Sequence, residues 1–133
     1  MNPRYPLVSG RADHRCEYCR APEAIFNFPF EIEHITPISR GGTDEESNLA
    51  LACRSCNIHK SNHLTGTDES TGNETLLFNP RQDKWDEHFQ IDRESGAING
   101  VTPEGRATVS RLRMNAFLQS EARLLWIGLG LFQ

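Results

Sequence analysis

The sequence of 133 residues lacks a long hydrophobic run, and it has no cysteine outside two close pairs. Its N-terminus has no apolar stretch after the first charged residues, so it does not have the pattern of a secretory signal. The most apolar run, Leu124 to Leu131, contains two glycines and is far shorter than the roughly 20 residues of a membrane helix. We therefore expect a cytoplasmic protein with no membrane partner.

An excess of positive charge is also absent. The formal net charge is -4 and the sequence pI is about 5.7. A protein that binds nucleic acid over its whole surface needs many Lys and Arg side chains to neutralise phosphates, so any nucleic acid must be bound here by a local patch. The length fits one ordinary domain of about 100 to 200 residues, and there is no internal repeat. We expect residues 1–133 to form a single domain.

The four cysteines form two Cys-x-x-Cys pairs, Cys16 with Cys19 and Cys53 with Cys56. In a reducing compartment this pattern favours a metal site over disulfides. Two such turns, each a zinc knuckle, supply the four thiolates of a closed tetrahedral Zn²⁺ site. Zinc contributes about 10 to 16 kcal/mol of apparent free energy in small domains, enough to hold a thin core together. The alternatives are two redox dithiols or buried cysteines without a ligand.

The chain between and after the two pairs alternates short apolar runs with polar turns. The predicted elements of this core are, in chain order, two short strands or one interrupted strand over Ile25 to Ile35, an exposed loop over Ser39 to Ser47, a short buried strand over Asn48 to Cys53, and a polar helix over Arg54 to His63 that Gly66 ends. The acidic run at residues 44–46 belongs to the exposed loop and is not predicted to bind metal.

The segments outside this core carry weaker patterns. Residues 1–15 are polar and broken by prolines, and residues 67–74 are rich in Ser, Thr, Gly and acids, which is typical of a mobile loop. An extension over about residues 76–133 is predicted to contain a helix capped by Asn79 with Trp85 and Phe89 on one face, a hairpin over Gln90 to Val101, and a helical region from Thr102 to about Ile127. The predicted fold class is therefore α+β.

An ordered set of residues lies within the cysteine frame. The set comprises Glu33-His34-Ile35-x-Pro37, Gly41-Gly42, Asn48-Leu49 and Cys53-x-x-Cys56-Asn57-x-x-Lys60. It resembles the HNH endonucleases, whose ββα-metal motif is a strand, a loop, a second strand and a helix around one divalent cation. The resemblance covers about residues 16–66. It is specific in order and spacing, because Asn48 lies fourteen residues after His34 and Asn57 lies nine residues after Asn48.

The resemblance implies a role for each of these polar residues. His34 would be the general base that takes a proton from the attacking water, a task that neutral imidazole suits near pH 7. Glu33 and Asn57 would bind Mg²⁺ or another divalent cation through oxygen, and the cation would polarise the phosphate and stabilise the leaving 3′-oxygen. Asn48 would brace the loop and orient His34. Lys60, one helical turn beyond Asn57, would meet a phosphate oxygen.

Two features of this set bear on the cation. Adjacent residues of a regular strand point to opposite faces, so Glu33 and His34 can serve one site only where the strand gives way to the loop, which Pro37 makes plausible. The family more often has Asp or His at the position of Glu33, which leaves the metal preference open. His59 competes with Asn57 as the helix ligand, but residues two apart on a helix point well apart, and this favours Asn57.

DNA, double- or single-stranded, is the partner that the resemblance implies, while the oligomeric state is left open. The basic side chains predicted as possible DNA contacts are Arg40, Arg54, His59, Arg106 and Arg111. Arginines along a helix are usually only solvated, and the expectation of a DNA partner is what makes phosphate contact plausible for the last two.

The function predicted from the sequence is that of a metal-dependent HNH endonuclease, which hydrolyses DNA phosphodiester bonds around a structural zinc site. The alternative from another class is a non-catalytic zinc module that binds nucleic acid or protein. Such a module has no need of a base beside an acid, so His34 and its neighbours discriminate the two. A third possibility is a redox protein that uses the Cys-x-x-Cys pairs, which tight zinc retention would exclude.

Overall fold

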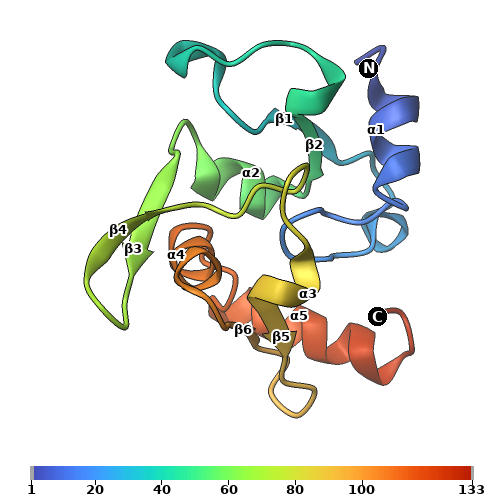
Figure 1. Ribbon diagram of the computed structural model, residues 1–133. Helices are drawn as coiled ribbons and strands as arrows, with labels where there is room; N and C mark the ends of the chain where they lie inside the picture. The colour runs from blue at the N-terminus through green and yellow to red at the C-terminus, as the bar shows by residue number, and fades with distance from the viewer. Residues whose placement is uncertain (1, 133) are drawn as a thin grey trace.

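The computed structural model describes residues 2–132, and within this range it combines short helices with small antiparallel sheets (Figure 1). Each sheet has two strands, and the pairs are β1 with β2, β3 with β4, and β5 with β6. The predicted α+β class is confirmed. Buried side chains from the cysteine frame, β2, the β5–β6 hairpin and α4 form one hydrophobic cluster, so the extension packs onto the same core as the cysteines.

The segment between the cysteine pairs folds in the predicted order of strand, loop, strand and helix. Strand β1 (Glu31–His34) pairs antiparallel with β2 (Leu49–Ala52), and α2 (Arg54–Lys60) follows directly. Every residue of β2 is buried, as its apolar sequence requires. The helix ends earlier than predicted because Ser61 has a positive φ of 50°.

The N-terminal part contains a helix that the sequence reading missed. Helix α1 spans Tyr5–Arg11, and Pro6 lies in its first turn, where a proline costs no hydrogen bond. The prolines therefore begin a helix and do not break one. The expected strand from Ile25 is also wrong at its start, because η1 (Glu23–Phe26) is a 3₁₀ turn that ends in the left-handed residue Asn27.

The predicted mobile loop at residues 67–74 is instead part of a hairpin. Strand β3 (Thr65–Asp68) pairs with β4 (Asn73–Leu76), and the hydroxyls of Thr65 and Thr67 donate to Glu74 across it at 2.9 and 2.7 Å. Gly66 does not end a helix but lies in β3 against α4, where an added Cβ would come within 2.5 Å of a backbone oxygen. Contact with α4 therefore orders a segment whose composition is that of a loop.

The helix predicted to start at Asn79 does not form. The Asn79 side chain accepts from Arg81 N, and the Asp83 carboxylate accepts from Asn79 N, so local bonds hold a turn in place of a helix. Helix α3 (Trp85–His88) is a single turn, and Phe89 already belongs to β5 (Phe89–Ile91). The predicted hairpin is confirmed, with β6 (Ile98–Gly100) as its second strand.

The C-terminal helical region consists of two helices. Thr102 caps α4 (Pro103–Arg111) as predicted, with its hydroxyl accepting from Gly105 N at 3.0 Å. Helix α5 (Phe117–Gly128) follows after a break at which Arg113 has a φ of 51°. None of the helices in residues 2–132 has the length and apolar character that a membrane crossing requires.

A buried arginine attaches α5 to the rest of the chain. Arg123 is only 1% exposed, and its guanidinium donates to Gly96 O at 2.6 Å and to Met114 O at 2.8 Å. Trp126 of the same helix packs against the ring of Phe26, with 5.9 Å between centroids. Because the Arg123 contacts reach the β5–β6 turn and the segment before α5, they fix the helix on two sides.

Replacing Arg123 with Met is expected to lower the free energy of unfolding by about 2 to 4 kcal/mol. The change removes the donors of two buried carbonyls, and each unsatisfied group costs about 1 to 3 kcal/mol. Urea unfolding followed by circular dichroism in the presence of zinc measures the loss. Arg123→Lys is expected to lose less, and the exposed Arg93→Gln should match the parent. An unchanged midpoint for Arg123→Met would contradict this role.

Candidate functional site

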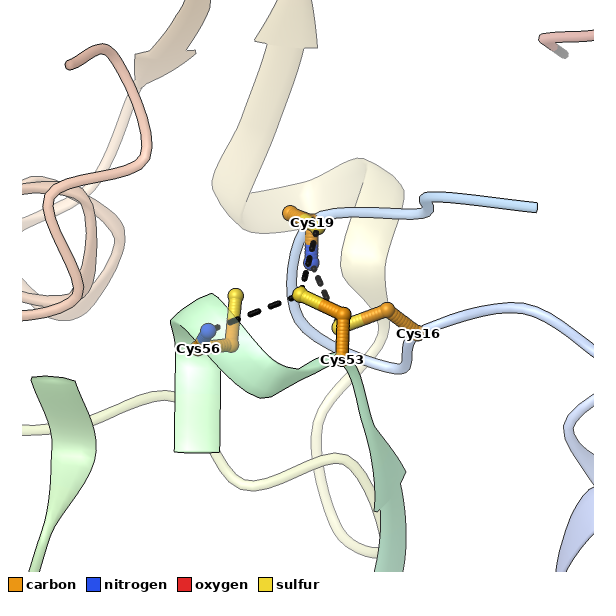
Figure 2. A group of neighbouring side chains, drawn as sticks. All are labelled: Cys16, Cys19, Cys53 and Cys56. Carbon is orange, nitrogen blue, oxygen red and sulfur yellow. Dashed lines mark hydrogen bonds between the residues drawn. The ribbon is translucent and has the colours of Figure 1, made fainter. Parts of the chain in front are cut away.

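The side chains of the four cysteines converge on one buried point (Figure 2). Cys16 and Cys19 lie in the turn after α1, Cys53 follows β2, and Cys56 lies in the first turn of α2. All four are free and at most 2% exposed, and their sulfur atoms lie within 4.8 Å of one another. The chain therefore brings two motifs that are far apart in sequence to a single site.

This donor set fits zinc. Four thiolates at a Zn–S distance of about 2.3 Å form a tetrahedron whose sulfur atoms are about 3.8 Å apart. The Cys19 and Cys53 sulfurs lie 3.7 Å apart, which suits a shared ion and is far beyond the length of a disulfide. Full burial also disfavours the redox alternative, because reactive thiols are partly exposed. The structure supports the predicted four-cysteine metal site.

The purified protein is expected to contain one zinc per chain by elemental analysis, and Cys56→Ser is expected to lose it. Because metal binding supplies folding free energy in small domains, the variant should also lose helical circular dichroism, and the parent should unfold on treatment with chelator. Ser55→Ala changes the neighbouring residue and should retain zinc. A folded protein with no bound metal, or with the cysteines linked by disulfides, would refute the assignment.

His34 lies at the end of β1, where the loop to β2 begins. Its side chain is 32% exposed, and its Nε2 lies 2.9 Å from a carboxylate oxygen of Asp44. The acidic run was expected to be a solvated loop, and the Asp44 side chain is 68% exposed, but the loop also folds back and brings this carboxylate to the imidazole. The sequence held no signal for this contact, because the acid lies ten residues after the histidine, in an exposed loop.

Asn48 closes the loop that carries Asp44. Its side-chain oxygen accepts from Thr36 N at 2.8 Å, and its side-chain nitrogen donates to Thr36 O at 2.9 Å and to Thr43 O at 2.7 Å. Gly42 permits the closure, because a Cβ there would lie 1.8 Å from Thr36 O. The bracing predicted for Asn48 is therefore present, and it holds both ends of the segment between His34 and Asp44.

Comparison with known protein families gives a match that covers this site. Residues 16–63 match the model described as HNH endonuclease, a range that includes both cysteine pairs, His34 and Asn48. This part of the chain is similar to HNH endonuclease domains. Its four-cysteine cluster is consistent with a subtype that has a zinc site. No curated protein and no solved structure matches the chain.

Lys60, within the matched range, is buried, whereas a contact with a substrate phosphate was predicted. Its side chain is 2% exposed, and its Nζ donates to Glu33 at 2.9 Å, to Ile35 O at 2.9 Å and to His34 O at 3.3 Å. With three acceptors inside the protein, the ammonium group is not placed to meet a substrate phosphate. The prediction of a phosphate contact for Lys60 is therefore wrong. Its contacts hold the strand end that carries His34.

Glu33 and Asn57, the predicted cation ligands, lie in separate contacts. One oxygen of Glu33 accepts from the Tyr18 hydroxyl and the other from Lys60, and the side chain is 3% exposed. Burial raises the pKa of the Glu33 carboxyl, against the opposing effects of Lys60 and Tyr18. The Asn57 amide donates instead to Glu31. In this arrangement Glu33 and Asn57 do not fit a shared cation, and their role as its ligands stays a prediction.

The basic residues predicted to contact DNA fall into two groups. Arg106 makes a two-pronged ion pair with the buried Asp68 at 2.8 and 3.0 Å, and this hydrogen bonding lowers the pKa of that carboxyl. The Arg106 side chain is still 31% exposed, so its possible contact with DNA stays a prediction. The other predicted residues keep donors toward the surface: Arg40, Arg54, His59 and Arg111.

Substitutions of the buried pair Lys60 and Glu33 are expected to have strongly non-additive effects on the free energy of unfolding. Lys60→Met leaves a carboxylate buried without its cation, and breaking such a pair by removing one partner costs about 3 to 5 kcal/mol. The double variant Lys60→Met with Glu33→Leu removes both charges and should recover part of that loss. A double-mutant cycle of urea midpoints measures the coupling. Additive effects of the two substitutions would show that no pair exists.

Proposed function

We propose that this protein is an endonuclease that hydrolyses phosphodiester bonds of DNA with His34 as the general base. The match to the HNH endonuclease family supports phosphodiester hydrolysis as the reaction class. The main support for the proposal is the contact between His34 Nε2 and Asp44. A zinc module that only binds nucleic acid or protein does not need an oriented, partly exposed imidazole.

The contact with Asp44 determines which nitrogen of His34 acts. A proton on Nε2 satisfies the carboxylate and leaves the lone pair of Nδ1 to accept a proton from water. Asp44 also stabilises the imidazolium formed when the water attacks phosphorus, as an acid does when it orients a catalytic histidine. Asn48 keeps the loop closed around this pair through its bonds to Thr36 and Thr43.

No step of this proposal passes through a divalent cation, because Glu33 is bonded to Lys60 and Tyr18. The chemistry assigned to this chain is the orientation of His34 and the acceptance of a proton at Nδ1. Assays with Mg²⁺, with Mn²⁺ and with chelator determine whether the reaction also needs a metal other than zinc.

A second candidate function is that of a non-catalytic zinc module that binds nucleic acid. The burial of Glu33 beside Lys60 favours it, since a side chain predicted to hold the catalytic cation instead stabilises the fold. The two functions differ in what they require of His34. Binding alone tolerates its loss, whereas hydrolysis does not.

His34→Ala is expected to reduce the rate of DNA cleavage by about 10² to 10⁴, the usual contribution of a general base. The assay follows supercoiled plasmid and labelled single strands over time, with each metal and with chelator. Asp44→Asn is expected to reduce the rate by about tenfold, since it removes the orienting charge and keeps the imidazole. Glu45→Gln is the matched control from the same exposed run and should leave the rate unchanged.

Equal zinc content and equal circular dichroism in all variants show that the fold is retained. Cleavage that persists in His34→Ala would exclude the proposed base. Failure of the parent to cleave any DNA with any metal, together with binding of DNA, would favour the non-catalytic module.

A further inference from the structure

A polar hollow of about 400 Å³ opens between the end of α2, strand β3 and the end of α4. Four of its lining side chains are basic or can become so: His59, His63, Arg111 and Arg113. The exposed Ser61 adds a hydroxyl, and the hollow belongs to neither the cysteine cluster nor the contacts of His34. In a chain with a net charge of -4, such a concentration of cationic side chains is unusual and needs an explanation.

The basic side chains are placed by defined contacts. Arg111 donates from Nε to Thr65 O at 3.0 Å, and no other hydrogen-bond acceptor contacts its guanidinium within residues 2–132. Arg113 is exposed in the left-handed turn after α4. His59 is anchored through Nδ1, which lies 3.3 Å from the Ser55 hydroxyl. The arginines therefore keep free donors at the hollow, and planar guanidinium donors suit phosphate oxygens.

Two carboxylates lie near the rim and reduce the positive field. Glu74 accepts from the Thr67 hydroxyl at 2.7 Å, and Glu69 accepts from the Ser110 hydroxyl at 3.0 Å. The threonine hydroxyls lower the pKa of Glu74, and the charges of Arg111 and His63 lower it further. Both carboxylates are bonded to hydroxyls of the hairpin and helix. The arginines retain the donors that an incoming anion would need.

The hollow lies close to the loop that carries the proposed catalytic pair. Arg40 of that loop donates to Asn62 O at 2.6 Å, so the loop and the hollow share the segment that follows α2. Ser61 also lies one helical turn beyond Asn57, a rise of about 6 Å along the axis. A DNA strand has a phosphate about every 3.4 Å along its axis, so a strand bound at the loop that carries Arg40 presents several phosphates to its surroundings.

We propose that this hollow binds a backbone phosphate of the nucleic acid, away from the phosphate that is cleaved, with Arg111 and Arg113 as the principal contacts. The proposal rests on the proposed function and adds to it the surface on which the substrate lies. The contact is to phosphate, so it contributes affinity and position but no sequence preference.

Binding is tested apart from cleavage by working with the full-length His34→Ala protein. Fluorescence anisotropy measures its affinity for labelled duplex and single-stranded DNA between about 50 and 200 mM salt. Adding Arg111→Gln and Arg113→Gln is expected to weaken binding about tenfold or more, and to lower the salt slope by about 1 for each arginine. Arg93→Gln is the exposed arginine control, and Glu74→Gln is expected to strengthen binding two- to threefold.

An affinity and salt slope unchanged by the double arginine substitution would overturn the proposal, provided that zinc content and circular dichroism match the parent. Competition by inorganic phosphate, at the ionic strength of a chloride control, shows whether the site recognises free phosphate equally well. Displacement of DNA by phosphate at concentrations at which chloride has no effect supports the proposal, whereas phosphate that binds through Arg111 and Arg113 without displacing DNA overturns it.

Failure of this proposal is distinguishable from failure of the proposed function. If the parent and the variant with Arg111→Gln and Arg113→Gln cleave DNA at equal rates, the proposed endonuclease activity is retained and the hollow does not bind the substrate. If the protein binds DNA through these arginines but cleaves none, the phosphate contact at the hollow is supported and the proposed endonuclease activity is refuted. If the parent binds no nucleic acid, the proposal that the hollow binds a backbone phosphate is wrong.

Discussion

The convergence of four cysteine sulfurs is the constraint on which the remainder of the structure depends. Cys19 and Cys53 are 34 residues apart, and the whole of β1, the His34 loop and β2 lies between them. Cys53 also caps α2 through Cys56 N, so one cluster closes the loop and starts the helix. A two-stranded sheet is marginal by itself, and a metal held at this point supplies the free energy that its short strands do not.

A second network extends this constraint to the imidazole. Tyr18 lies between the two cysteines of the first pair and donates to Glu33, which in turn accepts from Lys60 of α2. Lys60 then donates to the carbonyls of His34 and Ile35. The cysteine turn, the first strand and the helix thus meet in one buried network of charged groups. With Asp44 at the ring and the closed loop beside it, His34 is held from several directions, as the proton transfer proposed for it would require.

The parts of the structure that the sequence predicted are those specified by short, chemically distinctive motifs. The Cys-x-x-Cys pairs predicted the metal cluster, and the apolar run at residues 48–53 predicted β2. The hairpin of β3 and β4 could not be predicted, because its Thr, Gly and acid residues are ordered by α4, which follows it in sequence by some thirty residues. Helix α1 was missed because the sequence alone does not distinguish a proline in the first turn of a helix from a proline that breaks a helix.

The contacts of the candidate site were harder to predict than its residues. The family resemblance assigned roles to Glu33, His34, Asn48 and Asn57, and of these roles the hydrogen bonds show the bracing of the loop by Asn48. Which carboxylate faces which partner depends on strand register and on the position of α2 across the strands. Neither is encoded in spacing, so Lys60 was assigned to a phosphate when it lies with Glu33. Asp44 was overlooked for a related reason, since an acid in an exposed loop gives no sign of the fold that returns it to His34.

The same kind of ion pair limits how many basic side chains remain for the nucleic acid that we propose as the partner. Several basic side chains form contacts inside the protein. The ion pairs are Lys60 with Glu33, Arg81 with Glu17 and Arg106 with Asp68, and Arg123 donates hydrogen bonds to backbone carbonyls. The remaining basic groups near the His34 loop are therefore few, and they lie along the end of α2 and the end of α4. For the DNA binding proposed above, such a surface would contact few phosphates. The affinity would then depend only modestly on salt, and the shape of the site would have to place the substrate.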